Sequence, residues 1–383
     1  MQNKQMDLPI YIDNNATTPL DERVLATMLP FLKGTFGNAA SNTHQHGWVA
    51  KQAVDTARKQ VAHLIGAEES EIIFTSGSTE AINIAIKGVW DVYKNKGNHI
   101  ITVKTEHKAV IDTCEYLQQK GAEITYLDVD AAGLIDLQQL ENAIIDKTIL
   151  VAVMYANNET GVIQPIEEIS EIVHAKKSIF FCDATQAVGK TMLDVSESGI
   201  DLMCLSGHKF YGPKGVGALY IRRKNPRVTL SPLFHGGGHE RGLRSGTLNV
   251  PGIVGLGKAC EIAAVEQWDN NVHVSKLRGY LEHQLLDIPS LRINGSTKHR
   301  LYNTSSLCFS GQSSAKLIGE WNPYFSVSTG SACSSALAKP SYVLEAMGLS
   351  EEDCYASIRF SFGKYNTQEE VEKAVDVIKK TLL

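Results

Sequence analysis

The stretch "EIIFTSGSTEAINIAIKGVWDVYK" (residues 71–94) contains a short apolar run rich in β-formers, a turn of small polar residues and a segment with helical spacing. Strand-like runs of the same kind recur along the chain, as "HIITV" (99–103), "ILVAVMY" (149–155), "IFFCDA" (179–184) and "DLMCLSG" (201–207). Segments with helical spacing follow the first two, "EHKAVIDTCEYLQQKG" (106–121) and "IEEISEIVHAKK" (166–177). Continuous apolar runs separated by helices predict an α/β fold with a mostly parallel central sheet and helices on both faces.

The pattern changes after Gly255, where a long helical stretch runs to about Leu286. Shorter strand-like and helical segments then alternate to the end of the chain, which indicates a smaller α+β C-terminal domain. We expect a large domain over 16–260 and a small domain over 261–383. We expect residues 1–15 to form an N-terminal segment that packs with the small domain.

Composition excludes several classes of protein. The net charge of the 383 residues is -5, which argues against nucleic acid as the main partner, because phosphate binding needs a basic face. The basic run "RRKNPR" (222–227) is short and interrupted by proline, so we interpret it as a solvated turn. The N-terminus has no apolar signal region and no run approaches the ~20 residues that span a bilayer, so we expect a cytoplasmic protein. Seven cysteines without a C-x-x-C spacing indicate free thiols.

Polar residues follow each of five predicted strands. They are "SGST" (76–79), "KTEH" (104–107), "ANNE" (156–159), "DATQ" (183–186) and "SGHK" (206–209). Ligands of open α/β sheets bind beyond the carboxyl ends of the strands, so these five turns are expected to surround one cleft.

Each group in this cleft has a structural alternative. Ser78 and Thr79 resemble a helix cap, yet the same geometry binds phosphate. Asp183 follows an apolar run and needs a buried partner, either an arginine or a protonated ring nitrogen. Lys209 either extends to solvent or acts as a nucleophilic amine, and His107 alone is more often structural. Pyridoxal 5'-phosphate is the cofactor that requires a Schiff-base lysine, an acid and a phosphate site together.

The stretch "STGSACSS" (328–335) surrounds Cys333 with small residues only. Buried cysteines usually lie among large apolar side chains, so this environment indicates a reactive thiol rather than a core residue. The alternative is a structural cysteine in a surface turn.

The motifs together resemble those of cysteine desulfurases of the iron–sulfur cluster assembly type, which are class V, fold-type I pyridoxal-phosphate enzymes. The resemblance covers nearly the whole chain and rests on "DNNATTP", "TSGSTE", "KTEHKAV", "NNETG", "DATQ", "SGHKFYGPKG", "GGGHERGLRSGT", "STGSACSS" and "SIRFSFG". It implies a homodimer with shared active sites, no membrane partner, and no metal in the active site.

The resemblance implies a role for each matching residue. Lys209 would hold the cofactor as a Schiff base, and Asp183 would pair with its pyridinium nitrogen. His107 would stack on the ring and take part in proton transfers, while Gln186 would bind the phenolic oxygen. The phosphate would be held by Ser78, Thr79, Ser206 and His208, with Thr247 from the neighbouring subunit. Substrate carboxylate would be bound by Asn158, which also belongs to the cofactor site, and by Arg359.

The implied reaction removes sulfur from L-cysteine, giving L-alanine and a persulfide on Cys333. Cys333 would lie in a mobile loop of the small domain (about 326–338) and pass the sulfur to an acceptor or scaffold protein, for cluster assembly, tRNA thiolation or both. The sequence departs from the family at Ala39, where we expect a local loop effect. It also departs at its end, "VIKKTLL", which puts the usual scaffold docking in question.

Two rival functions remain open at this point. A selenocysteine lyase or class V aminotransferase would keep Lys209 and Asp183 but would not need Cys333. A metal or thiol carrier finds its best support in "HQH" (44–46) together with the cysteines, although no spacing there makes a metal cage.

Overall fold

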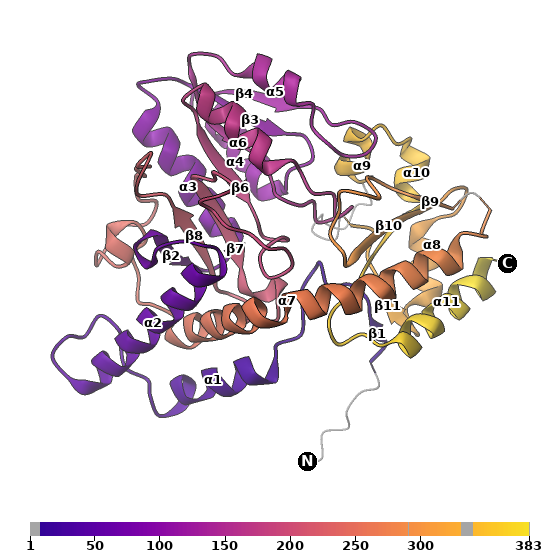
Figure 1. The fold of residues 1–383 in the computed structure, drawn as a ribbon, viewed down its shortest axis with the longest axis horizontal. Helices are drawn as coiled ribbons and strands as arrows, with labels where there is room; N and C mark the ends of the chain where they lie inside the picture. Colours follow the sequence, from indigo (N-terminus) through magenta and orange to yellow (C-terminus); the bar gives the residue numbers. More distant parts are fainter. Residues whose placement is uncertain (1–7, 290, 331–339, 383) are drawn as a thin grey trace.

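The computed structural model describes residues 8–289, 291–330 and 340–382. A seven-stranded sheet forms the centre of the larger part (Figure 1). In spatial order its strands are β2 (Ile72–Thr75), β8 (Gly217–Ile221), β7 (Leu202–Ser206), β6 (Ile179–Asp183), β5 (Thr148–Ala152), β3 (His99–Val103) and β4 (Glu123–Leu127). Strand β8 is antiparallel to both of its neighbours, and the other pairs are parallel. The predicted mostly parallel sheet is confirmed.

Helices cover both faces of this sheet. One face packs against α1 (Glu22–Lys33), α2 (Gln45–Leu64), α5 (Leu137–Ala143), α6 (Ile166–Ala175) and the first part of α7 (Val250–Leu285). The other face packs against α3 (Ser78–Tyr93) and α4 (Lys108–Gln118). Alternate residues of one strand enter opposite cores, as Phe74 and Ile73 of β2 do. The strands are continuously apolar because both faces are buried.

The smaller part is built on an antiparallel sheet. Its strands are β9 (Leu291–Ile293), β10 (Thr304–Phe309) and β12 (Ser357–Ser361), with β10 in the centre. Its helices are α8 (Ser314–Trp321), α9 (Tyr342–Ala346), α10 (Glu351–Tyr355) and α11 (Gln368–Leu382). This arrangement agrees with the predicted α+β character.

Helix α7 connects the two parts. Residues 250–263 contribute to the core of the large sheet, and residues 274–285 contribute to the core of the small one. The predicted division at residue 260 falls inside this helix, so it stays a prediction. The helix begins at Val250, before the predicted change at Gly255, because the side chain of Asn249 accepts a hydrogen bond from Gly252 N and caps it.

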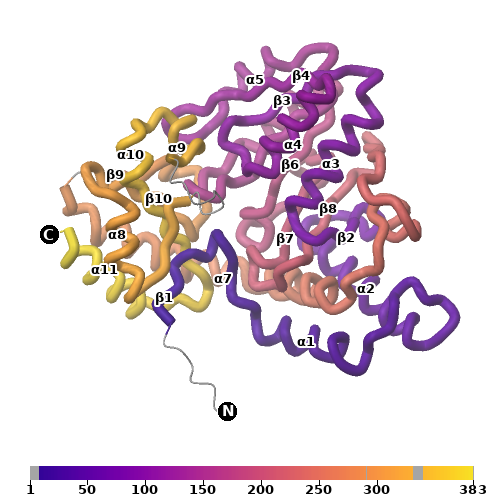
Figure 2. The backbone as a smooth tube through the Cα atoms, turned by 180° about the vertical axis from the view of Figure 1, so that it is seen from behind, coloured from indigo at the N-terminus to yellow at the C-terminus, as the bar shows by residue number. Residues whose placement is uncertain are grey.

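The N-terminal segment lies beside the small domain before it reaches the large one. Strand β1 (Ile10–Tyr11) pairs in parallel with β11 (Phe325–Ser326), and Ile12 is buried in the small-domain core. Figure 2 shows the chain continuing from β1 to α1, which lies along α7. The segment therefore contacts both parts of the molecule.

Two further predictions concern the strand 149–155 and the basic run 222–227. The predicted strand 149–155 is shorter, because β5 ends at Ala152 and Ala156 then pairs with Ile163 in an isolated bridge. Residues 223–227 are exposed, as expected for a solvated turn.

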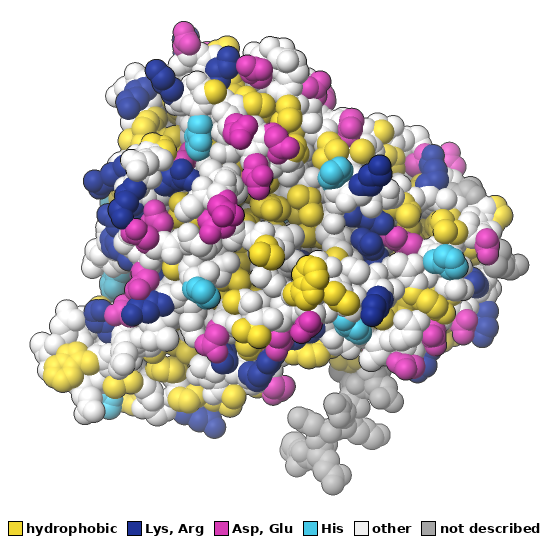
Figure 3. Space-filling model, viewed as in Figure 1, with side chains coloured by type: hydrophobic (Ala, Val, Ile, Leu, Met, Phe, Trp, Pro, Cys, Tyr) yellow, Lys and Arg dark blue, Asp and Glu magenta, His cyan; other side chains and the backbone are white. Residues whose placement is uncertain are grey.

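On the face seen in Figure 3, acidic and basic side chains are interspersed. Within the described ranges, no helix is both long and apolar enough to cross a membrane.

A buried ion pair joins helix α2 to the loop that follows β8. Arg58 donates to both carboxylate oxygens of Glu240, over 2.7 and 2.8 Å, and Glu240 also accepts from Phe74 N over 2.7 Å. The side chains are 10% and 2% exposed. Glu240 belongs to the motif "GGGHERGLRSGT" (236–247), so this pair anchors that motif against strand β2.

We predict that Glu240→Ala lowers the free energy of unfolding by about 3 kcal/mol, because it leaves the Arg58 charge buried without a partner. Urea unfolding followed by circular dichroism measures the change. Asp55→Ala is the matched control, since Asp55 forms an exposed pair with Lys51 on the same helix and is expected to cost about 0.5 kcal/mol or less. Equal losses in the two variants would contradict the prediction.

Candidate active site

The carboxyl ends of β2, β3, β5, β6 and β7 lie at one edge of the sheet, because these strands run in the same direction. A cavity of about 550 Å³ opens there. It is lined by ten of the predicted site residues: Ser78, Thr79, His107, Asn158, Asp183, Gln186, Ser206, His208, Lys209 and Arg359. The prediction that these turns surround one cleft is confirmed.

One end of the cavity suits an anion. Ser78 and Thr79 form the first turn of α3, whose free backbone N–H groups and dipole favour negative charge. Gly77 precedes them with a φ of 148°, a conformation that side-chain-bearing residues rarely adopt. The hydroxyls of Ser78 and Thr185 lie 2.6 Å apart and are hydrogen-bonded to each other. The local sequence therefore builds the turn that presents these groups.

His208 contributes a neutral ring to the same cavity. Burial lowers the pKa of His208 to about 4, and the positive charges of Lys209 and Lys214 act in the same direction. At neutral pH its imidazole offers a hydrogen bond without a charge. His107 caps helix α4, where its Nδ1 accepts from Ala109 N over 3.1 Å, so the neutral ring carries its proton on Nε2.

Asp183 is the last residue of β6 and is 4% exposed. Its Oδ1 accepts from Thr185 N over 3.0 Å, from Cys204 Sγ over 3.2 Å, and from the Thr185 hydroxyl. These bonds all use one carboxylate oxygen. The other oxygen takes part in none of them, which suits a site that accepts a protonated ring nitrogen.

Lys209 is held by the N-terminal segment. Its Nζ donates to the carbonyl oxygens of Asn15 over 2.6 Å and Ala16 over 2.9 Å. Gln186 Nε2 donates to the same Asn15 carbonyl over 2.9 Å. The amine thus lies within the cavity, positioned by backbone acceptors 193 and 194 residues away in the sequence.

Arg359 projects from β12 of the small domain and is 3% exposed. It donates to the Asn158 carbonyl over 2.9 Å and to Asp13 Oδ1 over 2.6 Å. Its Nε is buried and has no hydrogen-bond partner among the described residues. A buried donor without a partner favours an additional acceptor at this place, such as a carboxylate.

Two predicted residues are not part of this cavity lining. Thr247 is exposed, close in sequence to Arg244, which pairs with Glu80 over 2.7 Å at the start of α3. Thr247 is expected to contact the phosphate in the site of a neighbouring subunit. The structure of a single chain does not test this role. Cys333 lies outside the described residues, and Gly330, the last described residue before it, lines the cavity.

Sequence reasoning missed several residues of the site. Asn15 and Thr185 belong to the motifs "DNNATTP" and "DATQ". The motifs place both residues near the site, but the sequence does not predict the hydrogen bonds that they form. Glu106 precedes His107 and is fully buried. Glu106 Oε1 accepts from Met154 N over 2.6 Å, while Oε2 has no partner in the described part of the chain. Burial raises the pKa of Glu106 well above its usual range, the Met154 bond opposes this, and the charge of Asp183 reinforces it.

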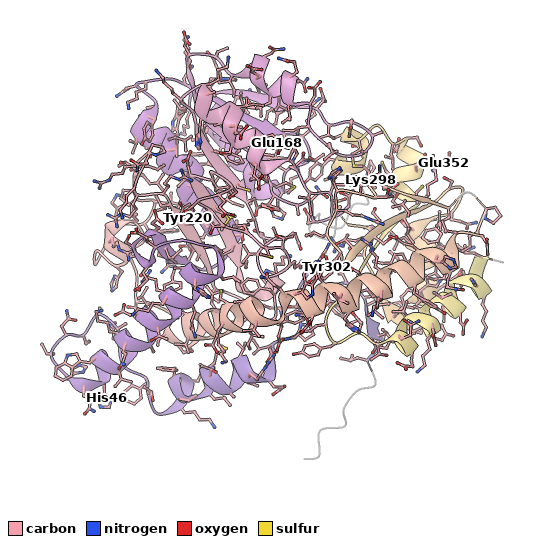
Figure 4. All side chains as sticks on the ribbon, viewed as in Figure 1. His46, Glu168, Tyr220, Lys298, Tyr302 and Glu352 are labelled. Atoms are coloured by element: carbon pink, nitrogen blue, oxygen red, sulfur yellow. The ribbon has the colours of Figure 1, made fainter. Side chains whose placement is uncertain are left out.

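The donor set fits pyridoxal 5'-phosphate. The cavity combines a lysine amine, a carboxylate with a spare oxygen, a neutral imidazole and the N-terminus of a helix with two hydroxyls. A metal carrier has no comparable support, since the described residues contain no cluster of three or more metal-binding side chains. His46 lies at the far end of α2, away from the strand ends (Figure 4).

Known proteins resemble this chain over nearly its full length. The family described as "Aminotransferase class-V" matches residues 10–374. A curated "Cysteine desulfurase IscS" from Haemophilus influenzae (strain PittGG) is 51% identical over 376 residues, which cover 98% of this chain and 93% of the relative. A protein of the same name from Edwardsiella ictaluri (strain 93-146) is 51% identical over 379 residues, with the same coverage.

Solved structures agree with these relatives. A "NIFS-LIKE PROTEIN" superposes with a TM-score of 0.92 at 40% identity, covering 98% of this chain and 99% of that one. "SspA in complex with cysteine" superposes with a TM-score of 0.82 at 37% identity, covering 94% and 100%. The expected fold is therefore confirmed.

We predict that Glu106→Gln changes how stability depends on pH. A raised pKa means that the folded protein keeps a proton that the unfolded chain loses near pH 4.5, so rising pH destabilises the parent. The variant lacks this titration. Its free energy of unfolding is expected to exceed that of the parent increasingly from pH 5 to pH 8, by at most about 1.4 kcal/mol per pH unit. The two should converge near pH 4.

Chemical unfolding of both proteins across this pH range is the measurement. Glu115→Gln on helix α4, which begins two residues after Glu106, is the control, because its side chain is exposed and is expected to give no such trend. Parallel stability curves for the parent and Glu106→Gln would mean that Glu106 is ionised in the folded protein.

Proposed function

The chain belongs to the class-V aminotransferase family and is a pyridoxal-phosphate-dependent cysteine desulfurase, and we propose how its residues divide the reaction. The observation that carries the proposal is the presence of Lys209 and Asp183 in one cavity with the N-terminus of α3. The names of the relatives favour this activity over an aminotransferase or a selenocysteine lyase.

When bound, the cofactor supplies an electron sink for the electrons that are released at the substrate Cα. Lys209 would hold the cofactor until the amine of L-cysteine replaces it, and the freed Lys209 amine then takes the substrate Cα proton as the base. Asp183 keeps a proton on the ring nitrogen. Thr185 N and Cys204 Sγ donate to its Oδ1 and fix the position of the carboxylate. His107 packs against the ring and offers Nε2 for proton transfer.

The remaining polar groups orient the two ligands. Ser78, Thr79, Ser206 and His208 hold the phosphate, and Gln186 binds the phenolic oxygen. The substrate carboxylate is bound by Arg359, whose unpartnered Nε favours an additional acceptor, and by Asn158, which also contacts the cofactor. A solved relative is described as bound to cysteine, which supports cysteine as the substrate of this cavity.

Cys333 accepts the sulfur. Its thiolate attacks the substrate sulfur, the bond between that sulfur and Cβ breaks, and the carbon skeleton leaves as L-alanine after protonation. The product on the enzyme is a persulfide. Every cysteine among the described residues is buried, and Gly330, three positions before Cys333, lines the cavity.

The assembly and destination of the sulfur follow from the same resemblance. The chain forms a homodimer in which Thr247 adds a phosphate contact to the neighbouring active site, consistent with its exposure in one chain. The persulfide passes to an acceptor or scaffold protein in the cytoplasm, for iron–sulfur cluster assembly, tRNA thiolation or both.

We predict that Lys209→Ala lowers cysteine turnover by at least about 1000-fold while the fold is retained, because the base is lost. Sulfide release with a reductant measures turnover, and borohydride reduction followed by peptide mass spectrometry locates the attached cofactor. Lys214→Ala is the control, since Lys214 lines the same cavity and its removal is expected to leave the label on Lys209. Near-normal turnover, or a label on another lysine, would refute the assignment.

We predict that Cys333→Ser still binds the cofactor and cysteine but forms no persulfide, because a hydroxyl is a poor nucleophile towards sulfur at neutral pH. Mass spectrometry after incubation with cysteine is the measurement. The buried thiols should not substitute, since burial raises the pKa of Cys114 to about 12 and that of Cys354 to about 11.

Cys354→Ser provides the comparison and should still accumulate the sulfur adduct on Cys333. A persulfide on another cysteine of Cys333→Ser, with alanine formed at the parent rate, would make Cys333 dispensable.

A further inference from the structure

Lys190 is a buried lysine that the reaction above does not use. It is 7% exposed and is the last residue of "DATQAVGK" (183–190), which begins at the last residue of strand β6. Its Nζ donates to Gln186 Oε1 over 2.8 Å. The partner is a neutral amide rather than a carboxylate, which is unusual for a buried amine.

The bonds of Gln186 determine which way its amide points. A lysine amine donates hydrogen bonds, so the oxygen Oε1 must face Lys190. The Asn15 carbonyl only accepts, so the nitrogen Nε2 must face it, and the distance is 2.9 Å. Two independent partners therefore assign the same amide orientation. One of the two Nε2 hydrogens is used by Asn15, and the other remains for a ligand.

We propose that Lys190 is a positioning residue that makes Gln186 a hydrogen-bond donor towards the cavity, so that the site selects a cofactor with an oxygen anion beside this amide. The inference rests on the proposed function, in which Gln186 binds the phenolic oxygen of pyridoxal phosphate. Without Lys190 the amide is oriented by the Asn15 carbonyl alone and its oxygen has lost its donor, so Nε2 is held less firmly towards an oxygen anion.

The charges around Lys190 are compatible with this role. Burial lowers the pKa of Lys190 to about 7, and the positive charges of Lys209 and Arg359 act in the same direction. His208 also feels the charge of Lys190. The protonated amine only donates and so dictates the orientation of the amide, and the Asn15 carbonyl favours the same orientation when the amine is neutral.

Lys190 also lies near residues that precede strand β10. Lys190 and Lys209 line a small cavity together with Tyr302 and Asn303. Tyr302 lies where the small domain meets α7 (Figure 4). The Asn15 carbonyl oxygen accepts from both Gln186 and Lys209. A movement of the Gln186 amide after loss of Lys190 would therefore also change the hydrogen bond of the Lys209 amine.

The test compares two ligands of the cofactor-free protein. Pyridoxal phosphate and its 3-deoxy analogue, which lacks the phenolic oxygen, are titrated separately, and the ratio of their dissociation constants is measured by absorbance. In Lys190→Met, which keeps the side-chain length, we expect the preference for pyridoxal phosphate to fall about tenfold, the effect of losing one hydrogen bond to a charged oxygen. An unchanged ratio would overturn the role of Lys190.

A double variant separates positioning from a direct effect. Gln186→Met should lose the same preference, and Lys190→Met should cause no further loss in that background. Additive losses would show that Lys190 acts independently of Gln186 and would overturn the proposal. Lys364→Met is the control for removing a buried lysine outside the cavity lining, and its ratio should match that of the parent.

A second substitution covers failure of Lys190→Met to fold. Lys190→Gln keeps a polar side chain, but its amide can donate or accept and so no longer dictates the orientation of Gln186. The preference should again fall, and an unchanged preference would again overturn the proposal. If the parent binds no pyridoxal phosphate, the proposed cofactor is wrong. If it binds and the ratio survives in the variants, only the role of Lys190 is wrong.

Discussion

Asn15 is the buried junction on which the active site depends. It is 1% exposed and uses both its backbone and its side chain for hydrogen bonds. Its side chain donates to Thr304 Oγ1 over 2.9 Å, and its N–H donates to Ser361 Oγ over 2.9 Å, both in the small domain. Its carbonyl accepts from Lys209 and Gln186 in the large domain. The relative placement of the two domains therefore sets the position of the catalytic amine.

Burial determines the charge of the groups around this junction. In water Glu106 and Lys190 are charged at neutral pH, and His208 becomes charged at mildly acidic pH. Burial raises the pKa of Glu106 and lowers the pKa of His208 and of Lys190, so it favours the neutral form of each side chain. Asp183 accepts hydrogen bonds from Thr185 N and Cys204 Sγ at the end of β6. A buried carboxylate fixed in this way is well suited to hold a proton on a ring nitrogen.

Burial also separates the cysteines. The six described thiols lie in the cores: Cys114, Cys182, Cys204, Cys260, Cys308 and Cys354. Cys204 even takes part in the site, but as a donor to Asp183 rather than as a nucleophile. A protein that handles sulfur needs its other thiols inert, and burial raises the pKa of five of them, which disfavours the thiolate: Cys114, Cys182, Cys204, Cys260 and Cys354.

The sequence by itself determined the alternation of strands and helices and the five polar turns at the strand ends. It also identified nine of the residues that line the cavity, because short apolar runs and the turns after them are local patterns. Only the tertiary structure decided that β8 runs antiparallel, that α7 belongs to both cores, and that Asn15 meets Lys209. The bonds of Lys190 and the burial of Glu106 were equally out of reach. These features depend on which distant segments pack together, and burial, which sets the charges, exists only after packing.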